Sequence, residues 1–211
     1  FWTDVDGVYT ADPRVVKDAI LVDDMSYEEA MELSFFGSKV LHPKTIAPLQ
    51  AKGIEAWSLN SHNPEARGTR IGQGPFESRK KSSICGISCL KRVSMVSVSG
   101  ALMRGRTGMA SKIFSAVSSV GSSILLITQS SSEYTISFCV RDDEASRVKD
   151  ALAAKFELEI REKLIDEIDV RPNCAIVSVV GDGMIANRGV ASKFFNALSS
   201  QDINILVIAQ G

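Results

Sequence analysis

Hydrophobic and polar positions in the second half of the chain follow one pattern that occurs twice. Val96–Val98 reappears as Val177–Val179, an offset of 81 residues (177 minus 96), and about half of the positions from 96 to 129 are identical at this offset. Each copy opens with strand-like alternation, passes through a loop with Gly and Met, and reaches helical spacing near Gly108 or Gly189. A strand rich in Ile, Leu and Val follows. The pattern predicts two copies of one supersecondary unit.

The first copy continues beyond the part that is repeated. Its pattern predicts a strand over 134–140, a helix over 142–154 and a final strand near Phe156–Ile160. The resulting order, βαββαβ, is that of a ferredoxin-like unit. The second copy stops at Gly211, after its second strand, which would leave sheet edges unpaired. We therefore expect it to be cut short or to borrow the remaining elements from elsewhere.

The segment before the repeats has helix signals that are local and specific. A helix is predicted to begin at Ser26, because Glu29 three positions later completes a capping box, and to end at Gly37. Pro43 suits the first turn of a second helix, which is predicted to end near Gly53. Together with a strand over 54–59, these elements predict a mixed α/β segment.

Composition marks a boundary between this segment and the repeats. Residues 73–92 are rich in Ser, Lys, Arg and Gly, which is typical of a linker, with one strand around Ile84–Leu90. The predicted fold class is α/β (α+β), with a mixed segment followed by tandem ferredoxin-like units, the second truncated. The predicted parts are 1–72, the linker 73–92, a first unit over 93–162 and an incomplete second unit over 163–211.

Bulk composition excludes several classes of function. Of the 211 residues, 45% are hydrophobic and 23% charged, as in an ordinary globular protein, and the apolar runs are strand-sized. A formal charge of −1 argues against nucleic acid or an anionic membrane as the main partner. No basic and hydrophobic leader opens the sequence, so secretion is not expected. The basic cluster Arg79–Lys81 is interpreted as a solvated linker.

The four cysteines, Cys85, Cys89, Cys139 and Cys174, do not follow the spacing of a zinc site. We interpret them as reduced cytosolic thiols that pack as small hydrophobic side chains. An Asp-rich stretch from Asp4 to Asp12 lacks the Gly and Glu positions of an EF-hand, so it is not interpreted as a calcium site. No metal site and no self-contained active site are predicted.

A polar run near the N-terminus is the one candidate for a nucleotide site. Arg14 and Lys39 can neutralise phosphates, and Tyr9 can stack on a purine or hydrogen-bond to it. Taken one at a time, such residues are more often surface charges or core aromatics. On residue chemistry alone the pattern stays ambiguous.

Here the chain resembles a known family, the aspartokinases. The stretch Trp2–Arg14 is similar to their nucleotide-binding signature, and Met25–Ala30 and Phe36–Pro43 also match. So does Asn63–Thr69, although Arg67 stands where the family usually has Pro. The repeats resemble the tandem ACT domains of the same enzymes. Ile127–Tyr134 is most similar to threonine-sensitive forms that are fused to homoserine dehydrogenase.

This resemblance implies an activity and a set of nucleotide contacts. The parent enzyme would use ATP with Mg²⁺ to phosphorylate the side-chain carboxylate of aspartate, the first step of lysine, threonine and methionine biosynthesis. The family's catalytic Lys-Phe-Gly-Gly and Gly-Arg-Gly-Gly-Ser-Asp segments are not in these 211 residues, so no catalytic residue is assigned and the fragment alone is expected to be inactive. A cytoplasmic location is expected, or a plastid in a plant or alga. The implied ATP contacts are Thr3, Asp4, Tyr9, Arg14, Lys39 and Val40.

The repeated loops suit a small amino-acid effector. Each delivers the chain to a helix N-terminus, where backbone N–H groups favour an α-carboxylate. Gln129 and Gln210 end the second strands and offer an amide to an α-ammonium or a hydroxyl. Threonine fits these groups, and in the resembling family both glutamines belong to effector sites that mediate feedback inhibition. The predicted effector-binding residues are Met103, Gly108, Met109, Ala110, Ile124 and Gln129 in the first copy, and Met184, Gly189, Val190, Ala191, Ile205 and Gln210 in the second.

Two alternatives stay open. A monofunctional aspartokinase inhibited by lysine would want an acidic group near the ligand ammonium, and Glu133 is a candidate. A stand-alone amino-acid-binding module would need no ATP signature, so the N-terminal segment argues against it. Because ACT units commonly pair side by side, at least a dimer is expected.

Overall fold

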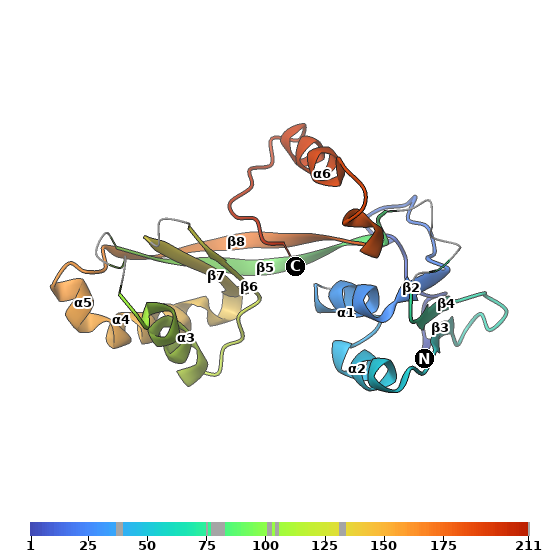
Figure 1. Ribbon diagram of the computed structural model, residues 1–211, viewed down its shortest axis with the longest axis horizontal. Helices are drawn as coiled ribbons and strands as arrows, with labels where there is room; N and C mark the ends of the chain where they lie inside the picture. The colour runs from blue at the N-terminus through green and yellow to red at the C-terminus, as the bar shows by residue number, and fades with distance from the viewer. Residues whose placement is uncertain are drawn as a thin grey trace. The chain divides into compact units, whose positions relative to one another are not determined.

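The computed structural model describes residues 1–36, 40–74, 76, 83–100, 103, 106–130 and 134–210. The chain forms two compact units, described separately below (Figure 1). The first unit contains Phe1–Leu90 and Ile176–Asn204, and the second contains Lys91–Ala175 and Ile205–Gly211. Each unit combines helices with a sheet, as the α/β prediction requires.

The first unit is built on a four-stranded sheet in the order β1-β3-β4-β2. β1 (Trp2–Thr3) runs parallel to β3 (Ala56–Asn60), which is antiparallel to β4 (Thr69–Gly72). β2 (Asp24–Ser26) runs parallel to β4. The fully buried Thr69 hydroxyl accepts from the Val8 amide at 2.8 Å and donates to the Val22 carbonyl at 2.6 Å, so it fixes the loop around Val8 to the sheet.

Two helices of this unit, α1 and α2, begin where local chemistry predicts, and α2 also ends there. α1 (Tyr27–Phe35) opens with the capping box: the Ser26 hydroxyl accepts from the Glu29 amide, and the Glu29 carboxylate accepts from the Ser26 amide, both at 3.1 Å. α2 (Pro43–Lys52) starts on proline and ends at Gly53, whose φ of 63° is left-handed. The predicted stop at Gly37 lies outside the described residues.

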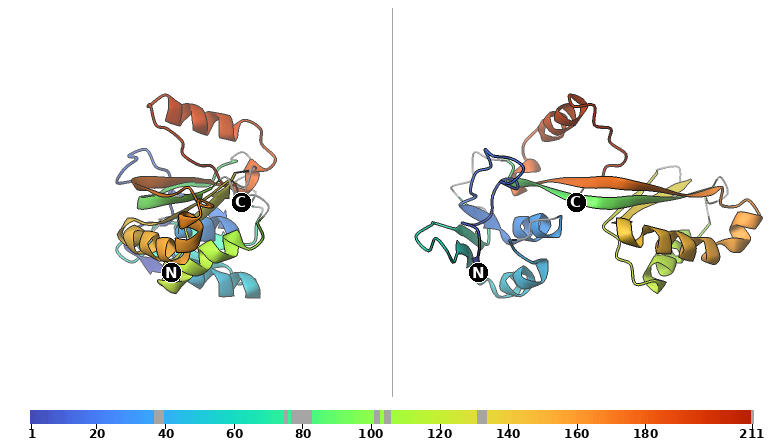
Figure 2. Two further views of the ribbon diagram at one scale, coloured as in Figure 1. Left: turned by 90° about the vertical axis from the view of Figure 1, so that its left-hand side faces the viewer. Right: turned by 180° about the vertical axis from the view of Figure 1, so that it is seen from behind.

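The second sheet has the order β6-β7-β5-β8. β7 (Thr135–Arg141) lies between β6 (Leu126–Gln129) and β5 (Gly86–Ser99) and is antiparallel to both. β8 (Glu167–Val180) lies beside β5 in every ribbon view (Figure 2). In the second unit, α3 (Met109–Ser119) and α4 (Ala145–Lys155), which follows the short helix η2 (Asp142–Glu144), bury a common core with this sheet.

The strand predicted near Phe156–Ile160 is wrong. Phe156 is fully buried at the end of α4, and α5 (Glu157–Arg161) is a helix in which the Ile160 amide donates to the Phe156 carbonyl at 2.9 Å. The alternation of Phe156, Leu158 and Ile160 suggested a strand with one buried face, but Leu158 is half exposed. A short apolar run of this kind does not distinguish a strand from a helix. The beginning of β8 is the strand that closes the first copy.

The second copy departs from the prediction at its end. Residues 203–210 form no strand, although a strand rich in Ile and Leu was expected there. In the first copy the equivalent β6 is held by β7 through the pairing Leu126↔Cys139, whereas among the described residues no strand pairs with 203–210. Without a hydrogen-bonded neighbour the apolar pattern alone does not form a strand. α6 (Val190–Ser199) does form, but none of its residues is buried.

Two equivalent contacts show how the second copy is completed. The Asp166 amide donates to the Ser99 carbonyl at 2.8 Å, and the Cys85 amide donates to the Val180 carbonyl at 2.7 Å. Donors and acceptors are related by the repeat offset. A Cβ on Gly100 would lie 2.3 Å from the Leu164 carbonyl oxygen, and one on Gly181 would lie 2.3 Å from that of Ser83. The second copy therefore pairs with the strand segment that precedes the first copy, which supplies one of the elements that its own sequence lacks.

An ion pair fixes α5 to the start of α3. The Lys112 ammonium donates to the Glu159 carboxylate and lies 4.7 Å from the centre of the Phe156 ring. The hydrogen bond from Lys112 is the main reason that the pKa of Glu159 lies below its ordinary value, and Arg106 contributes a smaller electrostatic effect. The ion pair therefore connects α3 to α5, the helix before the strand that closes the first copy.

Replacing either close-approach glycine is expected to destabilise the protein. Gly100→Ala and Gly181→Ala should each lower the free energy of unfolding by about 1–3 kcal/mol, because backbone atoms occupy the space that a methyl group needs. Gly74→Ala is the control, since its nearest contact would be an ordinary 3.5 Å. Denaturant unfolding measures the difference; equal stability of Gly100→Ala and Gly74→Ala would contradict the close packing.

The Lys112–Glu159 pair predicts a pH dependence of stability. Because the folded-state pKa of Glu159 lies below the ordinary value of 4.5, its contribution is complete above 4.5 and is lost as pH falls through the folded pKa. Lys112→Met should remove about 1 kcal/mol at neutral pH and flatten this acid dependence. Unfolding between pH 3 and 7 tests it against Lys149→Met, an exposed position on α4. An unchanged pH slope in Lys112→Met would exclude the pair as its source.

Candidate functional site

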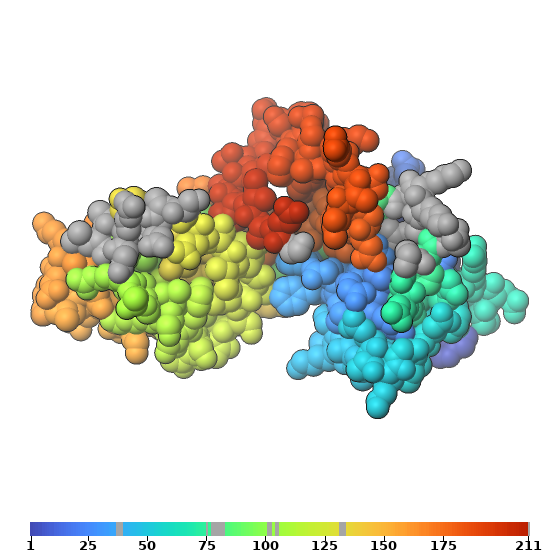
Figure 3. All heavy atoms as spheres, in the orientation of Figure 1, coloured from blue at the N-terminus to red at the C-terminus, as the bar shows by residue number. Residues whose placement is uncertain are grey.

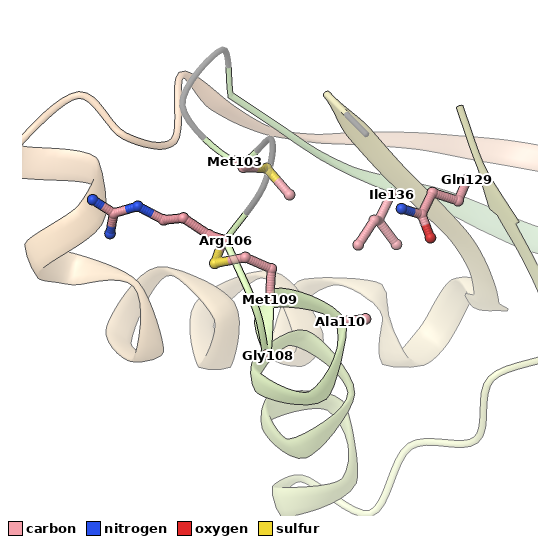
Figure 4. Close-up of a pocket in the computed structure, with 7 residues that line it drawn as sticks. All are labelled: Met103, Arg106, Gly108, Met109, Ala110, Gln129 and Ile136. Atoms are coloured by element: carbon pink, nitrogen blue, oxygen red, sulfur yellow. The ribbon is translucent and has the colours of Figure 1, made fainter. Parts of the chain in front are cut away.

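A pocket of about 160 Å³ opens at the N-terminus of α3, in the second unit (Figure 4). Its volume is smaller than that of sites for drug-sized ligands, so only a small molecule would fit. Sequence analysis predicted five of the lining residues and missed Arg106 and Ile136. The lining residues are Met103, Arg106, Gly108, Met109, Ala110, Gln129 and Ile136.

The backbone of this pocket suits an anion. Gly108 is the N-cap of α3 with a left-handed φ of 86°, and no side chain caps the helix. The first intrahelical bond runs from the Lys112 amide to the Gly108 carbonyl at 2.9 Å. The N–H groups of the preceding first turn have no intrahelical partner, and they lie at the positive end of the helix dipole. A carboxylate bound here would therefore meet several backbone donors.

The side chains divide the pocket into a polar and an apolar part. Gln129 ends β6 and carries an amide, while Met103, which is 4% exposed, lies close to the hydrophobic core. Figure 4 shows the Arg106 guanidinium extending away from Gln129, on the other side of the α3 N-terminus. Ile124 does not line the pocket; it packs against the core of the second unit.

Arg106 and Ile136 were missed for different reasons. Arg106 has no counterpart in the second copy, where the repeat offset leads to Asn187, so the repeat gave no signal for it. Ile136 belongs to β7, and its alternation identified a strand but not which end meets the loop. Pairing of Gln129 with Ile136 across β6 and β7 is what brings it into the pocket.

The second copy repeats the backbone of this site. Gly189 caps α6 with a φ of 87° and again no side chain caps the helix, and Met184 ends the short helix η3 (Asp182–Met184). Val190 and Ala191 open α6, whose atoms form part of the outer surface in Figure 3. These residues belong to the first unit, whereas the predicted Ile205 and Gln210 belong to the second.

The residues predicted to contact ATP lie in the first unit. Thr3 ends β1, and its hydroxyl donates to the Val5 carbonyl at 3.0 Å. The Arg14 guanidinium is fully exposed and donates to both Asp12 carboxylate oxygens, at 2.9 and 2.8 Å. This hydrogen bond and the charge of Asp12 raise the pKa of Arg14, with a smaller effect from Asp4, so Asp4 and Arg14 share one electrostatic environment.

The remaining nucleotide candidates are placed less closely together. Tyr9 forms a single bridge with Leu21, and Val40 packs against the core of the first unit. Lys39 lies outside the described residues. Of the predicted nucleotide contacts, Asp4 and Arg14 are thus related by a weak electrostatic effect.

The described residues hold no group of three His, Cys, Asp or Glu side chains able to bind a metal. No step below depends on a metal bound by this chain. Burial raises the pKa of Cys139 to about 11, so this thiol stays protonated at neutral pH.

Within the described residues, no helix is long and apolar enough to cross a membrane.

Comparison with known proteins identifies the two parts of the chain. Residues 1–60 match the amino acid kinase family, and residues 96–156 and 177–211 match the ACT domain. The bifunctional aspartokinase/homoserine dehydrogenase of Haemophilus influenzae is 50% identical over 210 residues, which cover this whole chain and 26% of that protein. The chain thus spans about a quarter of the length of that relative.

Solved structures give the same result for the fold. The aspartate kinase of Clostridium acetobutylicum superimposes with a TM-score of 0.85 at 31% identity, over all of this chain and 47% of that one. E. coli aspartokinase III, solved with aspartate and ADP, gives 0.80 at 26% identity, over all of this chain and 45% of that one. The same enzyme solved with lysine and aspartate gives 0.75. The chain belongs to the aspartokinase family and holds the C-terminal part of its amino acid kinase domain together with ACT-domain sequence.

Proposed function

We propose that this chain is the regulatory part of an aspartokinase fused to homoserine dehydrogenase, and that it binds threonine to inhibit the kinase. The observation that supports this most is the pocket at the α3 N-terminus, which combines an uncapped helix with the amide of Gln129. The Haemophilus relative is such a fused enzyme.

The pocket chemistry fits threonine group by group. The α-carboxylate would accept from the first-turn N–H groups of α3, where the helix dipole favours a negative charge. The Gln129 amide would accept from the α-ammonium or donate to the hydroxyl. Met103, Met109 and Ile136 offer apolar surface for the threonine methyl group.

Charge favours threonine over lysine in this copy. Arg106 is the one charged side chain among the seven lining residues described, and no carboxylate lines the pocket with it. Among these described lining residues a lysine ammonium would find a like charge and no acidic partner, which disfavours binding. Glu133, the candidate partner for lysine, lies outside the described residues. E. coli aspartokinase III, which was solved with lysine, is less similar to this chain than the Haemophilus relative is.

In the parent enzyme, the first unit would help to bind ATP. The γ-phosphoryl group would pass from ATP to a side-chain carboxylate oxygen of aspartate, giving ADP and 4-phosphoaspartate. Such transfer depends mainly on positioning and on neutralising phosphoryl charge. The exposed Arg14 suits this role, because its pair with Asp12 is solvent-exposed and easily exchanged for a phosphate. The open edge of β6 would allow pairing with a second copy of the chain.

Threonine is expected to raise the unfolding temperature of the chain. At about one hundred times Kd, binding stabilises by roughly 2.7 kcal/mol, which is several degrees at this size. Gln129→Ala should abolish most of this shift, whereas Gln201→Ala, at an exposed position after α6, should not. Thermal unfolding with threonine, lysine, methionine or no ligand measures it. A shift with lysine alone would support the lysine-inhibited enzyme, and no shift with any of them would contradict effector binding.

Arg14→Ala is expected to weaken ATP binding in the full-length enzyme. Loss of one charge-assisted contact to phosphate should raise the KM for ATP about tenfold or more, with the KM for aspartate little changed. Arg67→Ala is the matched control, since Arg67 is also exposed and also paired with an aspartate, Asp23. Steady-state kinase assays with ATP varied test the difference. Equal KM values in the two variants would remove Arg14 from the nucleotide site.

A further inference from the structure

The carboxylate of Glu29 makes a contact that its role as a helix cap does not require. Glu29 is 3% exposed, and its Oε2 atom accepts from the Ser26 amide to complete the capping box. Its other oxygen, Oε1, accepts from the backbone amide of Asp182 at 3.0 Å, a residue 153 positions away in the sequence. Both residues belong to the first unit.

This contact is strong for its type. A buried carboxylate that accepts two backbone N–H bonds makes charge-assisted hydrogen bonds, which are stronger than neutral ones. The carboxylate also lies at the N-terminus of α1, where the helix dipole stabilises a negative charge. Because the group is buried, loss of either donor leaves acceptor capacity that water does not readily replace.

The Asp182 amide is held in position on both sides. Val180, two residues earlier, accepts from the Cys85 amide at 2.7 Å, and Gly181 has no room for a side chain beside Ser83. Val180 and Cys85 also pack in the same core cluster as Tyr27 and Leu33 of α1. The start of the loop after β8 is therefore fixed to α1 by packing and by one hydrogen bond.

The two ends of this connection lead to different sites. Asp182 opens the η3 turn that ends at Met184, the counterpart of Met103 in the first-copy pocket, and the loop continues to Gly189 at the start of α6. Glu29 lies in the first turn of α1, and that helix ends at Phe35, shortly before Val40 of the predicted nucleotide segment. One helix thus separates the second effector loop from the nucleotide segment.

We propose that Glu29 is a positioning residue that couples the second effector loop to the nucleotide-binding segment through α1. An amino acid bound at the loop 184–190, which η3 connects to Asp182, changes the geometry of the Asp182 amide, and the bond to Glu29 transmits this change to the start of α1. The inference rests on the proposed threonine-binding function. It requires that the Glu29–Asp182 bond differ between the effector-bound and effector-free states.

Asp182→Pro in the full-length enzyme removes the donated N–H and leaves the capping box of α1 in place. Proline is compatible with this position, because it is the first residue of a short helix and Gly181 before it is extended, with φ 169° and ψ 126°. Asp182→Ala is the matched control: it removes the side chain and keeps the N–H. In Asp182→Pro the threonine concentration for half-inhibition should rise about tenfold or more. Calorimetric threonine affinity, kcat and the KM for ATP without threonine should stay within about threefold of the Asp182→Ala values.

A second pair of variants protects the test against misfolding of Asp182→Pro. Glu29→Gln places an NH₂ group against one of two backbone donors, so it should weaken inhibition while threonine still binds. Ser26→Ala weakens the cap, as expected for loss of an N-cap serine, but leaves the bond to Asp182. If Ser26→Ala impairs inhibition as much as Glu29→Gln, the effect is helix capping and the coupling is refuted.

The remaining outcomes separate this inference from the proposed function. Unchanged inhibition in both Asp182→Pro and Glu29→Gln would refute the coupling while threonine sensing stands. Loss of threonine binding in Asp182→Pro would make the loop part of the binding site only, which also refutes it. A wild-type enzyme that neither binds threonine nor is inhibited by it would refute the proposed function, and the coupling with it.

Discussion

The antiparallel pairing of β5 with β8 is the interaction on which both loops of the repeat depend. At one end the Asp166 amide donates to the Ser99 carbonyl, and at the other the Cys85 amide donates to the Val180 carbonyl. Immediately after each acceptor comes a glycine, Gly100 or Gly181, whose missing side chain lets another backbone approach. The pairing therefore determines where each effector loop leaves its strand, before any side chain of the loop is considered. β5 and β8 each serve both copies of the repeat, because one copy uses only part of the length of each strand.

The two copies share this backbone but differ in a charged side chain of the loop. Both helices begin at a left-handed glycine with no side-chain cap, so both present the same positive N-terminus. Arg106 in the first loop corresponds to Asn187 in the second, whose amide donates to the Gly183 carbonyl at 2.7 Å. The first loop thus has a positive charge at this position. The second loop has a neutral amide there, which is already hydrogen-bonded within its own turn. Two sites that arose by duplication are expected to differ in effector affinity for this reason.

Local chemistry made part of this structure predictable from the sequence. The capping box at Ser26 and the proline start of α2 need only residues within one helical turn, so the sequence contains all the information. The repeat gave most of the first pocket, because two copies of a loop identify it without knowledge of its partners. The error at Phe156–Ile160 arose because a short apolar run fits a strand or a helix equally well, and only packing decides. The Glu29–Asp182 bond joins residues far apart in sequence, and the periodicity of hydrophobic positions does not predict such a contact.

Regulation through α1 must obey thermodynamic reciprocity between threonine binding and ATP binding. If threonine lowers the affinity for ATP by a given factor, ATP lowers the affinity for threonine by the same factor, because both report one coupling free energy. A single buried hydrogen bond to a carboxylate is of the size that such couplings need, since a few kcal/mol corresponds to a change of one or two orders of magnitude. Val180, Cys85 and Leu33 belong to one buried core cluster, and because protein cores resist local shifts, a shift of the Asp182 loop would pass to α1. The coupling therefore depends on a carboxylate that the helix already needs for its cap, and this double use explains how a stabilising residue also transmits a signal.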